Sequence, residues 1–216
     1  MLRFRIPHRR ERPHFSKSAR TGALGTVSLL RDGQGSALLE FAITLPLLVV
    51  FVVGIYDFSG AFNQKQKIAQ AAQEGAIIAG AQPMTDIAPS SSSVPTSPAS
   101  LLPVVTAVFN SLASSGVVPA GTCAPPGSVS GPGTGLTWTY TISGCSTSGD
   151  NLVITINRGW VSGSATTGTP VAVGTIVTVQ YPYHWRFNSV IQLLVPGASY
   201  AAITQVTESA TVHNQM

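Results

Sequence analysis

One segment constrains this chain more than any other: an apolar run of twenty residues, 37–56, whose only charged residue is Glu40. At about 1.5 Å of rise per residue, a helix of this length spans roughly 30 Å, the hydrocarbon thickness of a bilayer. A carboxylate at the centre of such a span costs on the order of 2.5–3.5 kcal/mol, so it needs a partner or a purpose. The alternative is an acid tolerated near the helix N-terminus, where it interacts favourably with the macrodipole and reaches headgroup water. The run therefore predicts a membrane helix with one candidate functional acid.

Positive charge is concentrated ahead of this run. Eight of the twelve Lys and Arg residues lie among the first 31 residues, and only Lys65, Lys67, Arg158 and Arg186 follow the run. By the positive-inside rule, the N-terminus stays in the cytoplasm and the rest of the chain is exported. A basic stretch can also bind nucleic acid by neutralising phosphates, but beside a membrane span, topology and anionic lipid explain it more simply. We predict a single-pass protein of the cytoplasmic membrane, with a periplasmic or extracytoplasmic C-terminal domain and no nucleic-acid partner.

The helix is expected to continue beyond the membrane. Residues 57–80 are rich in Ala and Gln, and nothing stops a helix before Pro83. Apolar residues recur there at steps of three, four or seven, which predicts one apolar stripe: Phe58, Phe62, Ala69, Ala72, Ala76 and Ala79. Pro46 is compatible with a continuous membrane helix, as a kink. The alternative is an anchor joined to a separate amphipathic helix.

Four segments follow from these patterns. They are a basic cytoplasmic leader at 1–35, a transmembrane and stalk helix at 36–82, a Ser/Pro-rich linker at 83–100, and an exported α+β domain at 101–216. Within the last segment, residues 101–115 predict a short helix with Pro103 in its first turn. Strands are predicted at 136–142, 152–156, 171–183 and 200–212. Clean alternation over 136–142 favours an antiparallel sheet, with the short helix packed to one side.

Two cysteines, Cys123 and Cys145, fall on the exported side. An even pair in an oxidising compartment predicts a disulfide, closing a loop worth on the order of 3 kcal/mol in the chain-entropy model. A metal would need two more ligands, and the exported part has only His184 and His213, with no short ligand spacing to either cysteine. We therefore predict a disulfide and no metal site.

Catalytic motifs do not occur in the exported part of the sequence. It has no Gly-x-Ser-x-Gly elbow, no His-Glu-x-x-His and no phosphate-binding loop. His184 lies among Tyr181, Tyr183 and Trp185, which predicts a partly buried strand histidine in place of a catalytic base. The expectation is a protein that is not an enzyme and needs no cofactor.

The start of the apolar run resembles a known processing site. Gly35-Ser-Ala-Leu-Leu-Glu40-Phe is similar to the cleavage site of type IV prepilins, where a membrane peptidase cuts after a glycine and glutamate is the fifth mature residue. Cleavage after Gly35 would make Ser36 the first mature residue and Glu40 the fifth. The rival interpretation is an ordinary secretory signal, but residues 59–61 match its cleavage pattern poorly and the run is long for an h-region.

Two stretches resemble one family. Residues 35–48 look like the start of TadE-like proteins, the minor pseudopilins of the tight-adherence (Flp) pilus system, and residues 177–183 with 203–212 are similar to the family's closing strand pair. Family members often carry an arginine and an acid after the last strand, where this chain has His213-Asn-Gln. The departure leaves the role of the C-terminus open.

The resemblance implies a component of a pilus or secretion assembly apparatus. Its partners would be a prepilin peptidase, other pilins or pseudopilins, pilus assembly proteins and the lipid bilayer, and the mature protein could be extracted into a pilus. Glu40 would pair with the freed α-amino group of a neighbouring subunit, setting axial register. The alternative class is a membrane-anchored extracytoplasmic adhesin or binding domain, because strand edges and Ser/Thr-rich loops are generic binding surfaces.

Overall fold

The protein is described here by a computed structural model, which covers residues 33–87, 95–133, 136–162, 172–186, 197 and 203–215. The chain divides into two compact units, residues 1–47 and 48–216, and each is described by itself. Residues 1–32 of the predicted leader and 88–94 of the predicted linker lie outside the described residues.

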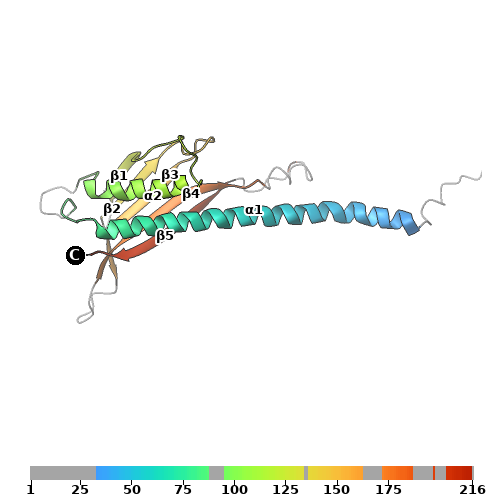
Figure 1. The fold of residues 1–216 in the computed structure, drawn as a ribbon, viewed down its shortest axis with the longest axis horizontal. Helices are drawn as coiled ribbons and strands as arrows, with labels where there is room; N and C mark the ends of the chain where they lie inside the picture. The colour runs from blue at the N-terminus through green and yellow to red at the C-terminus, as the bar shows by residue number, and fades with distance from the viewer. Residues whose placement is uncertain are drawn as a thin grey trace, which may run out of the picture. The chain divides into compact units, whose positions relative to one another are not determined.

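Helix α1, Gly33–Ala81, is the longest element, at 49 residues with Pro46 inside it (Figure 1). This confirms the long N-terminal helix. The predicted stripe was right for Ala72, Ala76 and Ala79, which are buried. It was wrong for Phe58 and Phe62, which are 54% and 62% exposed. The packed face instead runs through the small residues and isoleucine at Ile68, Ala71, Ala72, Gly75, Ala76, Ala79 and Gly80.

The second unit contains a five-stranded antiparallel sheet, in the order β1-β2-β3-β4-β5. The strands are β1 Ser128–Gly133, β2 Thr137–Ile142, β3 Leu152–Ser162, β4 Ala172–His184 and β5 Ile203–His213. Each strand pairs with the next along the chain, so short connections suffice and the α+β fold class is confirmed. The sequence did not predict β1, whose Gly131 and Pro132 are typical of a turn. It is an edge strand, the position in a sheet that tolerates proline.

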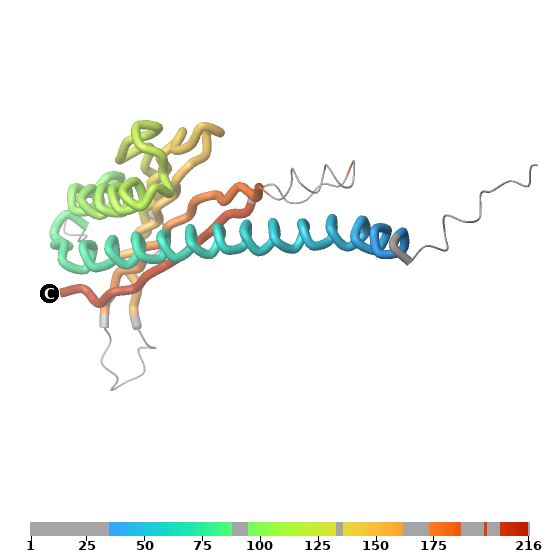
Figure 2. Tube along the Cα trace, turned by 45° about the vertical axis from the view of Figure 1, so that its right-hand side comes forward, coloured from blue at the N-terminus to red at the C-terminus, as the bar shows by residue number. Residues whose placement is uncertain are grey.

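Helix α2, Leu102–Ser114, follows a short 3₁₀ helix, Ala99–Leu101, and buries Val104, Val105, Val108 and Leu112. Figure 2 shows α2 beside the C-terminal part of α1, with the sheet behind both. The approach is close at Gly75, where a Cβ would overlap the Val108 side chain and lie 3.4 Å from Val177 Cγ1. One face of the sheet, including Trp138 and Ile156, is buried under these helices. Small residues on α1 thus allow two helices and a sheet to share one core.

A buried arginine fastens the C-terminal end of α1 to the sheet. Arg158 on β3 is fully buried, and its Nη2 donates to the carbonyl oxygen of Gln82 at 2.8 Å, with Nη1 3.4 Å from that of Pro83. Burial lowers the pKa of the guanidinium, and Asp86 opposes this shift. The Gln215 N–H also donates to the Gly80 carbonyl at 3.0 Å. Carbonyls that the helix leaves unpaired at its end are therefore satisfied by tertiary contacts.

Candidate functional site

The predicted processing and pairing residues all lie near the start of α1. Gly35, Ser36 and Glu40 are exposed. Thr44 Oγ1 donates to the backbone carbonyl of Glu40 at 2.9 Å, leaving the carboxylate itself uninvolved. Across the described residues, the Glu40 carboxylate forms no ion pair within 4.0 Å. Cleavage after Gly35 and charge pairing by Glu40 stay predictions.

Large apolar side chains surround this acid and continue along the helix. Leu38, Ile43 and Ile55 are 71%, 67% and 69% exposed. The helix is long and apolar enough to cross a membrane, and its most apolar stretch buries none of its residues inside the protein. Such a surface is stable in hydrocarbon or against other apolar helices, so it is compatible with single-pass anchoring.

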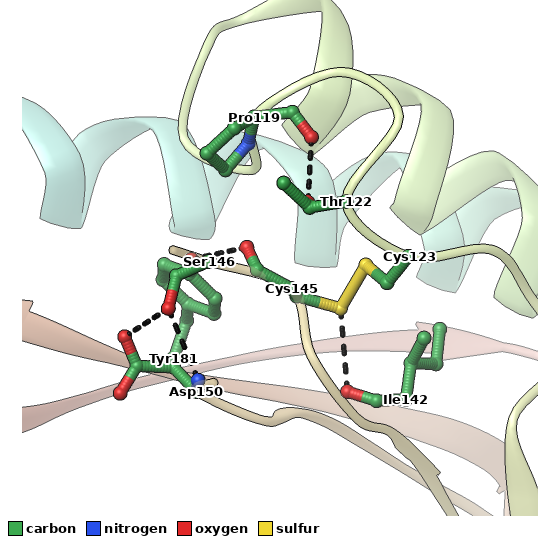
Figure 3. The surroundings of a disulfide bond; sticks show 8 residues. All are labelled: Pro119, Thr122, Cys123, Ile142, Cys145, Ser146, Asp150 and Tyr181. Carbon is green, nitrogen blue, oxygen red and sulfur yellow. Dashed lines mark hydrogen bonds between the residues drawn. A yellow bond between two sulfur atoms is a disulfide. The ribbon is translucent and has the colours of Figure 1, made fainter. Parts of the chain in front are cut away.

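The predicted disulfide is confirmed. Cys123 and Cys145 are joined, with Cα atoms 4.8 Å apart and a sequence separation of 22. The bond ties the segment after α2 to the β2–β3 connection (Figure 3). That connection is held further by Tyr181, whose hydroxyl donates to the Cys145 carbonyl at 2.8 Å. The bond therefore couples the segment that follows α2 to the sheet.

Beside the disulfide, two polar side chains meet at the carboxylate of Asp150. Ser146 Oγ donates to Asp150 Oδ2 at 2.6 Å, and His184 Nε2 lies 2.6 Å from the same oxygen. Burial disfavours the charged form, but the bonds from Ser146 and His184 outweigh it and hold the pKa of the Asp150 carboxyl below its ordinary value. His184 is the last residue of β4, a strand residue as predicted, and 43% of its side chain is exposed.

This cluster lacks the order that nucleophilic catalysis needs. A serine nucleophile must give its proton to a histidine, which is oriented in turn by an acid. Here the carboxylate lies between the serine and the histidine, and the serine hydroxyl donates to the acid. Within the described part of the chain, no group of three or more His, Cys, Asp or Glu side chains could hold a metal ion. The cluster's evident role is to hold the β2–β3 connection against the end of β4.

A cavity of about 560 Å³ adjoins this cluster. Its walls come from α1 just beyond the apolar run, from the end of β4 with residues 185–186, and from the loops at 116–117 and 146–150. At one wall Tyr183 donates its hydroxyl to Asp57 Oδ1 at 2.8 Å, and Asp57 is 2% exposed. Burial and the Asp57 carboxylate raise the pKa of Tyr183 to about 12, so the phenol remains a donor at neutral pH. Sequence reasoning missed this pair, because its members lie 126 residues apart.

Comparison with known families decides what the α1 segment is. Residues 35–76 match the family model of TadE-like proteins. This stretch of the chain is TadE-like. No curated protein and no solved structure matches the chain.

The TadE-like match begins at Gly35 and ends on α1, so it confirms the resemblance of the N-terminal stretch. The predicted resemblance of the β4–β5 pair to the family lies outside the matched residues and stays a prediction. Together with the membrane-capable helix, the TadE-like segment points to a component associated with a Tad pilus. TadE-like proteins are structural pilus components and not a known family of enzymes.

Proposed function

We propose that this chain is a pseudopilin-like, membrane-anchored component of a tight-adherence (Flp) pilus or secretion assembly apparatus, processed by a prepilin peptidase. The observation that carries the proposal is the TadE-like match, which begins at Gly35, five residues before Glu40. Removal of residues 1–35 would leave the apolar helix at the mature N-terminus. The helix would anchor the protein in the cytoplasmic membrane until assembly.

Glu40 supplies the assembly contact. A carboxylate within lipid gains most from an opposite charge, and cleavage after Gly35 creates one in the α-amino group of Ser36. The described part of the chain offers Glu40 no ion pair, which supports a partner on a neighbouring subunit. Pairing would neutralise both charges and set the axial register between subunits. The exposed apolar side chains around it would then pack laterally against other pilin helices.

The second unit belongs outside the cytoplasm in this proposal. Its disulfide supports this placement, since disulfides persist in oxidising compartments such as the bacterial periplasm. The basic residues ahead of the apolar run support the same orientation. The folded unit would present its sheet and loops to partner proteins while α1 remains among lipids or pilin helices.

The deciding experiment substitutes Glu40→Ala in cells that make the pilus. Piliation should be lost, while membrane insertion and cleavage persist, because removing a charge makes the span more apolar. N-terminal sequencing of the mature variant should begin Ser-Ala-Leu-Leu-Ala, against Ser-Ala-Leu-Leu-Glu for the unsubstituted protein. Glu74→Ala is the matched control, since Glu74 is an exposed acid on the same helix, beyond the membrane run.

Three results would contradict parts of this proposal. Normal piliation by the Glu40→Ala variant would reduce the carboxylate to a tolerated charge near the headgroups. An uncleaved leader in that variant would move the role of Glu40 to peptidase recognition. A mature N-terminus near Ala61 in the unsubstituted protein would replace prepilin processing with an ordinary secretory signal.

A second function, adhesion, is favoured by the sheet face opposite the helices. One row of paired residues crosses all five strands and carries a hydroxyl on each: Ser130, Thr139, Thr155, Thr178 and Ser209. On the same face of the sheet, the paired rows two residues to either side contain no charged residue. Such a face suits an uncharged, hydroxyl-bearing surface such as a polysaccharide. Loss of surface attachment in a Thr155→Val, Thr178→Val variant that still makes pili would favour adhesion over assembly.

A further inference from the structure

The cavity at the end of the apolar run has features that pilus assembly does not use. Tyr56, the last residue of the run, is 68% exposed, and the cavity is lined by it and the next turns of α1, including Asp57, Ser59 and Asn63. A span that ends at Tyr56 places these residues at the level of the lipid headgroups. The inference therefore rests on the membrane location given under Proposed function.

The cavity is bordered by aromatic rings of the kind that are enriched at membrane–water interfaces. Trp185 lines it and makes edge-on contacts with Phe58 and Tyr183, with ring centroids 5.3 and 5.1 Å apart. Tyr and Trp are enriched where a protein passes from hydrocarbon to headgroups, because their rings are apolar and their polar atoms reach water. Phe58 is 54% exposed, so the described parts of the protein leave this cluster of aromatic rings partly uncovered.

Cations are available at the cavity wall. Within the described residues the Arg186 guanidinium forms no ion pair and no hydrogen bond, although it lies near enough to Tyr183 to affect its ionisation. Lys67 donates to the Ser115 carbonyl at 2.8 Å, which uses one of its three N–H groups. A planar guanidinium with free donors matches the oxygens of a phosphate.

Two carboxylates in the same cavity disfavour a ligand that carries negative charge alone. Asp57 is buried against Tyr183, but Asp150 is accessible, with 13% of its side chain exposed. Both Ser146 and His184 contact Asp150 Oδ2, and Oδ1 accepts no hydrogen bond from the described residues. One open carboxylate oxygen and one unpaired guanidinium therefore share a single cavity.

We propose that this cavity binds the zwitterionic headgroup of a membrane phospholipid, with the phosphate at Arg186 and the ammonium at Asp150. Its lipid chains would lie along the exposed apolar side chains of α1, such as Ile55 and Phe58. A bound lipid would fix the folded unit against the membrane surface before assembly. Extraction into a pilus would then require this lipid to be released or carried along.

The test uses the full chain, purified in a non-ionic detergent and freed of lipid. Short-chain phosphatidylethanolamine is titrated, and binding is followed by native mass spectrometry and by tryptophan fluorescence. Arg186→Gln should weaken binding about tenfold, the usual effect of losing one charge-assisted hydrogen bond. Lys65→Gln is the matched control and should change binding less than twofold, because Lys65 pairs with Glu208 and does not line the cavity.

Four further ligands test which headgroup binds and whether it belongs to a lipid. Phosphatidylglycerol should bind several-fold more weakly than phosphatidylethanolamine, and Asp150→Asn should remove that preference. Diacylglycerol with the same chains, and free phosphoethanolamine or inorganic phosphate, should bind at least tenfold more weakly than the intact lipid. Equal binding of diacylglycerol would make the cavity a merely apolar site, and equal binding of the free ions would make a soluble anion its ligand.

Equal losses in the Arg186→Gln and Lys65→Gln variants would also overturn the proposal, since binding would then follow net charge. Thermal unfolding of each variant shows whether the fold is intact. The midpoint should not change in Arg186→Gln, because Arg186 is exposed and unpaired within the described chain. The measurement needs no pilus. A failure of lipid binding is thus distinct from a failure of the assembly function, which the Glu40→Ala variant reports.

Discussion

Two stretches of α1 differ in side-chain size and in surroundings. In the stretch 38–55, Leu38, Phe41 and Ile55 are 60–71% exposed, whereas Ile68, Ala72 and Ala79 in the stretch 68–80 are fully buried. The first stretch uses large side chains and the second uses mostly alanine and glycine. Large side chains therefore mark the part of the helix that needs an outside partner, and small side chains mark the part that packs within the protein.

The physical reason is the distance of approach. Small residues bring the helix axis close to α2 and the sheet, so a Cβ at Gly75 or Gly80 would overlap a valine side chain. Large residues keep neighbouring elements further away. When they are buried by a partner, they remove more apolar area from water, and each Å² contributes roughly 25 cal/mol of stabilisation. A large apolar surface of this kind is stable when lipid or other subunits cover it. The following predictions test this division of α1.

The largest effect is expected from the disulfide, which should stabilise only the folded unit. A Cys123→Ser, Cys145→Ser variant should lose about 3 kcal/mol of unfolding free energy, because its unfolded chain regains the closed loop's freedom. Chemical denaturation in detergent measures the loss, and carbonate extraction should find the variant as firmly in the membrane as before. Thiol labelling of the denatured, unreduced wild type should modify neither cysteine. Full labelling would contradict the bond itself.

A smaller and more direct test makes the same change in both stretches. Gly75→Ala should destabilise the folded unit by roughly 1–2 kcal/mol, since overpacking against the stiff Val108 side chain exceeds the gain in helix propensity. Gly54→Ala is the matched control, because a Cβ there meets no atom within 4 Å. The midpoint of thermal unfolding should fall in the first variant only. Equal midpoints in the two variants would contradict the close packing at Gly75.

The sequence predicted these elements unevenly, for reasons that individual residues show. Hydrophobic periodicity and residue composition were sufficient to predict α1, α2 and β2–β5. An even number of cysteines on the predicted exported side was sufficient to predict the Cys123–Cys145 bond. β1 was missed because glycine and proline in an edge strand resemble a turn. Phe58 and Phe62 were assigned to the packed stripe because hydrophobic periodicity cannot distinguish exposed apolar residues from those that face the core.

The cavity was the least predictable part. Tyr183 and Asp57 are separated by 126 residues, and neither lies in a motif. Arg158 offered no signal either, since its burial depends on the free carbonyls of Gln82 and Pro83 at a helix end. By contrast, the Gly35-to-Glu40 spacing is local, so it could be read from the sequence and matches the start of the TadE-like segment. Sites built by tertiary contact need the fold, whereas sites built by spacing do not.

The smallest effect is expected at Asp150, which joins the β2–β3 connection to the end of β4. Its pKa is held below the ordinary value, so its contribution is present at neutral pH and is lost as the pH falls below about 4 towards the folded-state pKa. Asp150→Asn should therefore cost under about 1 kcal/mol at pH 7 and progressively less in acid. The measurement is the difference in unfolding free energy between the two proteins from pH 7 to pH 3, where shared acids cancel. Ser146→Ala removes one hydrogen bond to the carboxylate, so it should reproduce part of this pH dependence. A difference that stays constant across this range would show that the Asp150 carboxylate is not preferentially ionised in the folded protein.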